Sequence, residues 1–182
     1  MSRVKLAVAV ALLGAVMTAS AVAIAGGGGK VTARLDGFQE VPTVLTDGKG
    51  KVKLKINDSA RTIDFVLRYT DLEGTIVQQA HIHIGAAHTT GQVSVFFCGG
   101  AKPACPPSPA TVTGTITAAD VIPRRDQGVE TFEDLVEAIR KGITYANVHT
   151  DKSPAGEIRG QLGAKKDDNG HNGNGTGNGR DY

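Results

Sequence analysis

Three of the five histidines in this chain lie in the stretch AHIHIGAAHTTG, residues 80–91. A single isoleucine separates His81 from His83, and alternate side chains of a β-strand point to the same side. Two imidazoles on that spacing, about 7 Å apart along the backbone, can bind one metal ion through bonds of about 2 Å. The HxH pattern therefore indicates a metal site, provided that the segment is a strand.

A third histidine, His149, lies far away in the sequence, in ITYANVHT, where the same alternation turns it away from the core. If the two strands are neighbours, His81, His83 and His149 form a three-imidazole set. Such a set suits copper or zinc, whereas calcium would require carboxylates. His88 follows the HxH pattern in a loop and is either a fourth ligand or a surface residue. The alternative for the whole set is a group of hydrogen-bonded histidines without metal.

The elements that must position these side chains are short runs of alternating apolar and polar residues. Turn-forming stretches such as TDGKG, NDSA and DLEG separate the runs, which is typical of half-buried antiparallel strands. The runs are KVTARL, KVKLKIN, TIDFVLRY, QAHIHIG, GQVSVFF, TVTGTIT, ITYANVHT and GEIRGQL. They predict an all-β fold, an antiparallel Greek-key-like β-sandwich or barrel.

One segment, TFEDLVEAIRKG, has its apolar residues at helical spacing instead. Thr131 can cap its start, Glu133 and Asp134 suit the first turn, and Lys141 and Gly142 suit its end. We therefore expect one short inserted α-helix before the last two strands, where it covers an opening of the sheet structure.

The two ends of the chain differ in composition from its body. Residues 1–25 have a basic start, an apolar run and an A-x-A site, which predicts a signal peptide that is cleaved from a secreted or periplasmic protein. Residues 26–29 are a glycine linker, and residues 164–182, rich in glycine and asparagine, are expected to be disordered. Residues 30–163 remain as one domain, with no membrane segment after cleavage.

The charge balance bears on which partners the chain can bind, and the two cysteines bear on its covalent bonds. Cleavage removes Arg3 and Lys5 from the 20 basic residues, so that 18 remain against 18 acidic ones, and nothing argues for nucleic acid. In an exported chain, the closely spaced pair Cys98 and Cys105 favours a disulfide bond over a metal site.

Four motifs in order, LDGFQEVP, AHIHIG, ITYANVHT and SPAGEIRGQL, resemble the CHRD domain family, named after chordin. The resemblance covers residues 32–162 and implies an extracellular domain of the β-sandwich type, without established enzymatic chemistry. Chordin itself binds growth factors, so the resemblance also implies a possible extracellular protein partner. This chain, however, is a single short module that lacks the cysteine-rich repeats of chordin.

A weaker analogy connects the histidines with copper/zinc superoxide dismutase, a Greek-key barrel that also carries an HxH strand and a later strand-borne histidine. Arg159 is the candidate here for the arginine that lies near the copper in that enzyme. Glu157 either orients a histidine or pairs with Arg159 on a solvated strand face. Because no loop supplies a zinc site, redox catalysis would need a mononuclear copper centre.

These observations lead to three functional hypotheses. The first is an exported module that binds copper or zinc through His81, His83 and His149, with His88 as a further candidate ligand. The second is a mononuclear copper oxidoreductase that acts on superoxide or a similar oxidant. The third is a metal-free adhesion module that binds another extracellular protein. No nucleophile motif or phosphate-binding loop is present in the sequence, and we assign no catalytic residue.

Overall fold

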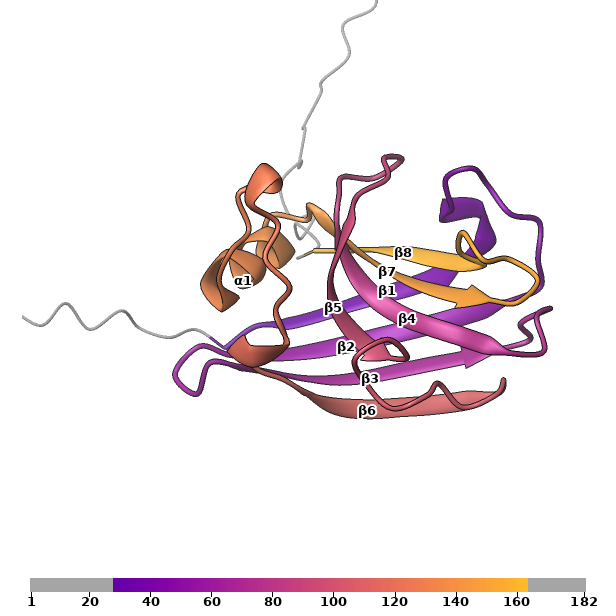
Figure 1. The fold of residues 1–182 in the computed structure, drawn as a ribbon, viewed down its shortest axis with the longest axis horizontal. Helices are drawn as coiled ribbons and strands as arrows, with labels where there is room; N and C mark the ends of the chain where they lie inside the picture. Colours follow the sequence, from indigo (N-terminus) through magenta and orange to yellow (C-terminus); the bar gives the residue numbers. More distant parts are fainter. Residues whose placement is uncertain (1–27, 164–182) are drawn as a thin grey trace, which may run out of the picture.

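In a computed structural model, which describes residues 28–163, eight antiparallel strands form one sheet that curls into a nearly closed barrel (Figure 1). The strands are β1 (Lys30–Asp36), β2 (Lys49–Asn57), β3 (Thr62–Thr70), β4 (Val77–Ile84), β5 (Gln92–Cys98), β6 (Ala110–Ile116), β7 (Thr144–Thr150) and β8 (Ile158–Leu162). One α-helix, α1 (Phe132–Arg140), and three 3-10 turns, η1 (Gly37–Gln39), η2 (Ala118–Asp120) and η3 (Arg125–Gln127), complete the described chain. Each predicted run overlaps one of the strands, so the all-β prediction is confirmed, with the barrel rather than two separate sheets as its form.

The strand order around the barrel is β5-β4-β7-β8-β1-β2-β3-β6. The hairpins β1–β2 and β2–β3 are neighbours in sequence and in space, whereas β3 pairs with β6 and the chain crosses over to β4. β5 and β6 form the two edges of the sheet, and one backbone hydrogen bond of 2.8 Å, from Ile122 N–H to the Ser94 carbonyl, links β5 to the segment after β6.

The inward-facing residues of the strands form one apolar core. Alternation places Val52, Leu54 and Ile56 of β2 inside and the lysines between them outside. The same alternation applies to β4 and β7, the two strands that carry histidines. Their inward-facing residues are Ala80, Ile82 and Ile84 on β4 and Ala146 and Val148 on β7. The side chains between these residues, including the histidines, therefore point to the outside of the barrel.

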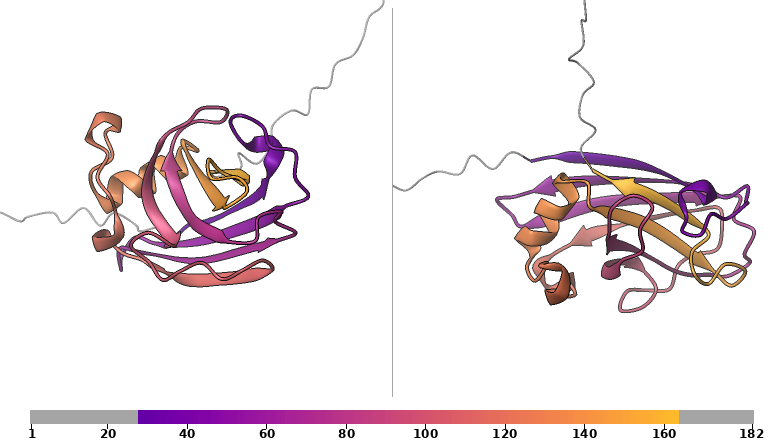
Figure 2. Two further views of the ribbon diagram at one scale, coloured as in Figure 1. Left: turned by 45° about the vertical axis from the view of Figure 1, so that its right-hand side comes forward. Right: turned by 90° about the horizontal axis from the view of Figure 1, so that it is seen from above.

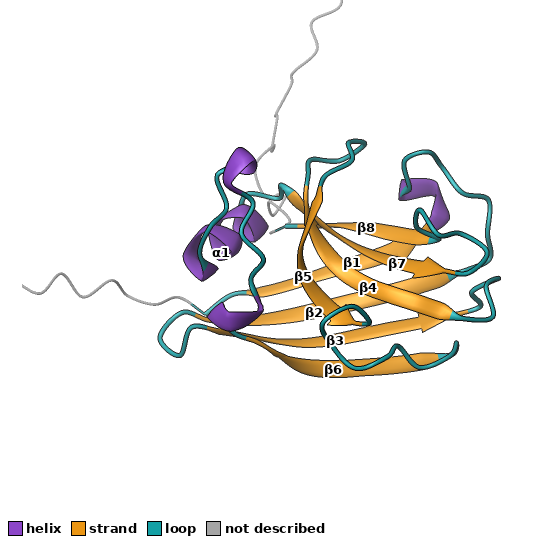
Figure 3. Cartoon of the chain, in the orientation of Figure 1, coloured by secondary structure: helices purple, strands orange, loops and turns teal. Residues whose placement is uncertain are grey.

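Helix α1 lies at one end of the barrel (Figure 3). Its first turn is capped by Thr131, whose hydroxyl accepts from Asp134 N–H while the Asp134 carboxylate accepts from Thr131 N–H. The side chains that join the core are Phe132, Leu135, Val136, Ala138 and Ile139. Gly142, with φ of 71°, follows the helix in the left-handed conformation that ends it. The predicted helix, its cap and its place before the last two strands are confirmed.

A disulfide bond joins Cys98, the last residue of β5, to Cys105, as predicted. The predicted signal peptide of residues 1–25 and the tail of residues 164–182 lie outside the described residues. Within residues 28–163, no helix is long and apolar enough to cross a membrane.

The outer side of the barrel is also covered at β7, where all seven residues are buried. Loops on either side of the strands provide this cover, because side chains from β7 and β8 bond to them. Asn147 donates to Glu40 in the loop after β1, Arg159 donates to the carbonyl of Ala86, and Gln161 donates to the carbonyl of Gly85. A second, polar layer therefore lies outside β4, β7 and β8, and it contains the histidines.

Candidate metal centre

The pairing of β4 with β7 brings the three strand histidines together. Gln79 lies opposite His149 and His81 lies opposite Asn147, so His149 is the diagonal neighbour of His81 on the same face. The ring centroid of His81 lies 4.5 Å from that of His83 and 4.6 Å from that of His149. The sequence prediction that the two strands are neighbours, with all three imidazoles on one patch, is confirmed.

The three histidines each offer one nitrogen atom to the same small volume, and these atoms lie within 4.8 Å of one another. Two metal–nitrogen bonds of about 2 Å span at most about 4 Å. Small rotations of the rings therefore suffice to place the three nitrogens around one ion.

Backbone carbonyls determine which nitrogen faces the centre. His83 Nδ1 lies 2.9 Å from the carbonyl oxygen of Gly91, and His149 Nδ1 lies 2.8 Å from that of Pro154. Because a carbonyl only accepts, both Nδ1 atoms carry the proton and donate it, and both Nε2 atoms keep a free lone pair. A backbone carbonyl in this role is what orients metal-binding histidines in proteins.

The other imidazole nitrogens of the three histidines are buried and have no hydrogen-bond partner within the described residues. They are Nε2 of His83, Nε2 of His149 and both ring nitrogens of His81. A buried polar atom without a partner costs about 1–3 kcal/mol, and such atoms are rare in folded proteins. A cluster of such nitrogens is the arrangement that a bound ion would satisfy.

Burial keeps these imidazoles neutral. The exposed fraction is 1% for His81, 9% for His83 and 7% for His149. Burial, with smaller effects from His83 and His149, lowers the pKa of His81 to about 2. Burial lowers the pKa of His83 to about 4, although its hydrogen bond to Gly91 acts in the opposite direction. Burial also lowers the pKa of His149. At neutral pH no proton therefore competes with a metal ion for the lone pairs.

Aromatic rings and an arginine form the wall of the cluster. Phe96 meets His81 edge to face at 5.3 Å, and Tyr145 stacks on His83 at 4.6 Å with the two planes 6° apart. On the other face of Tyr145, Arg159 Cζ lies 3.4 Å from the ring centroid. The Tyr145 hydroxyl also accepts from Gly91 N–H at 3.2 Å, so it steadies the loop that orients His83.

The fourth histidine of the prediction, His88, does not join the cluster. It is exposed in the loop after β4 and has a left-handed backbone with φ of 62°. Of its two predicted roles, the structure places it as a surface residue, and the cluster of three forms without it.

Both predicted roles of Glu157 are wrong, because this carboxylate is buried and binds loops. It accepts from Thr46 Oγ1 at 2.8 Å, Glu73 N–H at 2.6 Å and Thr150 Oγ1 at 2.6 Å. Burial alone would raise its pKa, but these donors outweigh burial and hold the pKa below its usual value. Glu157 therefore neither orients a histidine nor pairs with Arg159 on a solvated face.

Sequence reasoning missed Tyr145, Gly91 and Pro154 as parts of the site. Strand alternation could have identified Tyr145, because it lies four residues before His149 and therefore points to the same side of β7. The two carbonyl groups leave no signal in the sequence, since every residue carries one. Their role depends on where the loops fold, which only the three-dimensional structure shows.

Fold and site together define a small antiparallel β-barrel that carries a buried three-histidine cluster on its outer side. A family model for the CHRD domain matches residues 31–162, which is most of the chain, and the chain belongs to the CHRD domain family. The predicted resemblance is confirmed. No curated protein and no solved structure matches the chain, so the likeness to superoxide dismutase stays an analogy.

Proposed function

We propose that this CHRD-domain protein is exported and binds one copper or zinc ion through His81, His83 and His149. The observation that carries the proposal is the set of buried nitrogens without partners, with two of the rings oriented by the carbonyls of Gly91 and Pro154. A cluster of merely structural histidines would have its nitrogens bonded to the protein, because unpaired buried groups destabilise the fold.

The charge around the cluster favours copper in its monovalent state over zinc. The cluster contains no carboxylate, and the charges of Arg159 and Arg124 act on His83. The cost of burying an ion rises steeply with its charge, so a site without a compensating anion favours a monovalent ion. Zinc also takes a fourth ligand, whereas the neighbours here are the rings of Phe96 and Tyr145.

Burial of the rings favours an ion that is held over one that turns over a substrate. An oxidoreductase centre needs an open coordination position, and the exposed fraction of each histidine is below a tenth. The copper oxidoreductase hypothesis therefore has less support than the binding module. A superoxide-consumption assay that gave the copper-loaded protein a higher rate than free copper would reverse this order.

Metal titration of purified protein tests the site. We expect one equivalent of Cu(I) to bind, measured by competition with a coloured Cu(I) chelator, and zinc to bind at least tenfold more weakly. The His81→Ala/His83→Ala variant should bind neither ion. His88→Ala is the matched control and should bind like the wild type, because His88 is exposed and lies outside the cluster.

Two outcomes separate the parts of the proposal. Stronger zinc binding that still needs the histidines would refute the copper preference and keep the site. Equal metal content in the wild type and the double variant would remove the site altogether.

Export has two supports, the predicted signal peptide of residues 1–25 and the Cys98–Cys105 disulfide, which persists in oxidising compartments. N-terminal sequencing of protein from cell fractions should find a chain that begins close to residue 26, outside the cytoplasm. A full-length chain in the cytoplasm with reduced cysteines would contradict export.

A further inference from the structure

The outer face of β1, β2 and β3 carries a row of exposed cationic side chains. On β2 they occupy every second position, about 7 Å apart, so the row spans about 20 Å. We call this surface the basic ridge, and its residues are Arg34, Lys49, Lys51, Lys53, Lys55 and Arg68.

Like charges lie directly opposite one another across the ridge. Lys51 pairs in register with Arg34 on one side and with Arg68 on the other. Like charges at opposed positions destabilise a sheet, by roughly 0.2–1 kcal/mol for each pair. None of the ridge side chains takes part in an ion pair within residues 28–163. Acidic residues lie opposite its two ends, Asp36 opposite Lys49 and Asp64 opposite Lys55, whereas Lys51 and Lys53 in its middle have no acidic residue opposite them.

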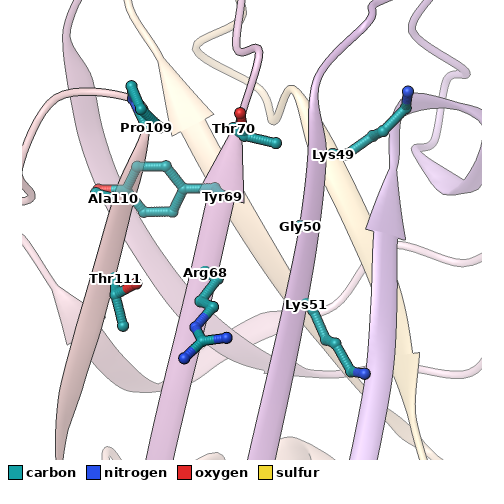
Figure 4. A pocket seen from close by; sticks show the side chains of 9 residues that line it. All are labelled: Lys49, Gly50, Lys51, Arg68, Tyr69, Thr70, Pro109, Ala110 and Thr111. Carbon is teal, nitrogen blue, oxygen red and sulfur yellow. The ribbon is translucent and has the colours of Figure 1, made fainter.

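A surface hollow of about 550 Å³ lies at one end of the ridge. Lys49, Lys51 and Arg68 line it together with Thr70, Pro109 and Thr111 (Figure 4). The figure shows Arg68 and Lys51 next to each other on neighbouring strands. An anionic group placed in the hollow would meet several cations at once.

We propose that the basic ridge binds a linear anionic polysaccharide that carries carboxylate or sulfate groups. The match is one of charge and shape, because regularly spaced cations along a strand suit a chain with regularly spaced anions. This proposal is independent of the metal centre, which lies on β4 and β7.

Two other polyanions fit the ridge less well. Single-stranded nucleic acid is normally bound with aromatic rings that stack on its bases, but Phe65 and Tyr69 of β3 are buried. An anionic membrane surface would be bound with apolar side chains near the cations. Within residues 28–163, the large apolar side chains that are exposed lie outside these three strands, and they are Phe38, Leu45, Ile76 and Ile143.

The test compares two variants that lose the same charge. Lys51→Gln/Lys53→Gln/Arg68→Gln removes three ridge cations. Arg61→Gln/Lys141→Gln/Lys152→Gln removes three cations from exposed ion pairs elsewhere, which contribute little to stability. Thermal unfolding of both variants confirms that each is folded before binding is measured.

The probes are heparin, which is sulfated, and polygalacturonate, which is carboxylated, each immobilised and titrated with the full chain. We expect the wild type and the control variant to bind at least one of them at low salt and to lose affinity as salt rises. The ridge variant should bind at least tenfold more weakly, with a shallower salt dependence. Equal binding by the ridge and control variants would overturn the proposal. So would tighter binding to single-stranded DNA or to phosphatidylglycerol vesicles, or no binding to either polysaccharide.

Discussion

At His83, one hydrogen bond and one stacked ring decide how the imidazole faces the cluster. The Gly91 carbonyl takes the Nδ1 proton, and Tyr145 lies parallel to the ring on one side. The guanidinium of Arg159 covers the other face of Tyr145, so imidazole, phenol and guanidinium form a stack of three groups. His83 is thereby held in one tautomer and one plane by the protein alone.

This stack leads to a prediction about Tyr145. Replacing it with leucine should weaken metal binding by about tenfold or more, because partners that orient a ligand typically contribute 10–100-fold to affinity. Tyr145→Phe keeps the stack and loses only the hydroxyl that accepts from Gly91 N–H, so its affinity should stay closer to that of the wild type. Competition titration with a Cu(I) chelator measures both, and equal affinities for the leucine and phenylalanine variants would show that stacking has no part in the site.

At the scale of elements, β7 shows where sequence reasoning succeeds and where it ends. Period-two alternation in TYANVHT correctly predicted that Ala146 and Val148 point into the core and that His149 points to the outer side. The same pattern predicted that His149 points away from the core, but it gave no sign that the outer side is covered, and every residue of β7 is buried. The cover comes from loops, and alternation within a strand contains no information about what distant loops place over it.

The loop after β1 is one of these covers, and it is fastened by Glu40. Its carboxylate accepts from the Asn147 side chain of β7. Burial raises the pKa of Glu40 to about 7, although Arg159, Asn147 and the backbone of Val41 act in the opposite direction. Since the ordinary value is 4.5, the folded protein binds more protons than the unfolded chain between about pH 4.5 and pH 7. Stability due to this group therefore falls as the pH rises through that window.

Replacing Glu40 with glutamine should consequently stabilise the protein at pH 8 and have little effect at pH 4. A gain of about 1–3 kcal/mol at pH 8 is expected, since glutamine keeps the shape without the buried charge. Urea unfolding of metal-free protein at the two pH values measures it. Glu130→Gln, at an exposed ion pair, serves as the control and should change stability little at either pH. If the Glu40→Gln variant is less stable than the wild type at pH 8, the ionised carboxylate is favourable there and the prediction is wrong.

At the scale of the whole molecule, the strand order decides which features share a side of the barrel. The histidine cluster lies on β4 and β7, and the basic ridge is centred on β2, with β8 and β1 between them (Figure 2). The eight strands and the helix were predictable from local patterns, but this order was not. It depends on pairings such as β3 with β6, which join segments far apart in the sequence.

The same arrangement keeps the two proposed sites apart. Because the sites share no residue, changes at the ridge should leave metal affinity unchanged, and the two effects should add. Cu(I) titration of the Lys51→Gln/Lys53→Gln/Arg68→Gln variant checks this, and a changed copper affinity would show that the two sides of the barrel are coupled.

The loops that shield the histidines also have a kinetic consequence. The three histidines are at most 9% exposed, so we expect an ion to reach or leave their nitrogens only when a covering segment, such as the one with Gly91 or the one with Pro154, moves aside. Transfer of copper to a competing chelator should then be slow and should reach a ceiling as chelator is added, because the opening step sets the rate. Stopped-flow transfer measurements would show that plateau, whereas a rate rising in proportion to chelator throughout would mean that the ion is open to direct attack. A tightly gated ion of this kind would be stored by the protein and released on the timescale of its loops.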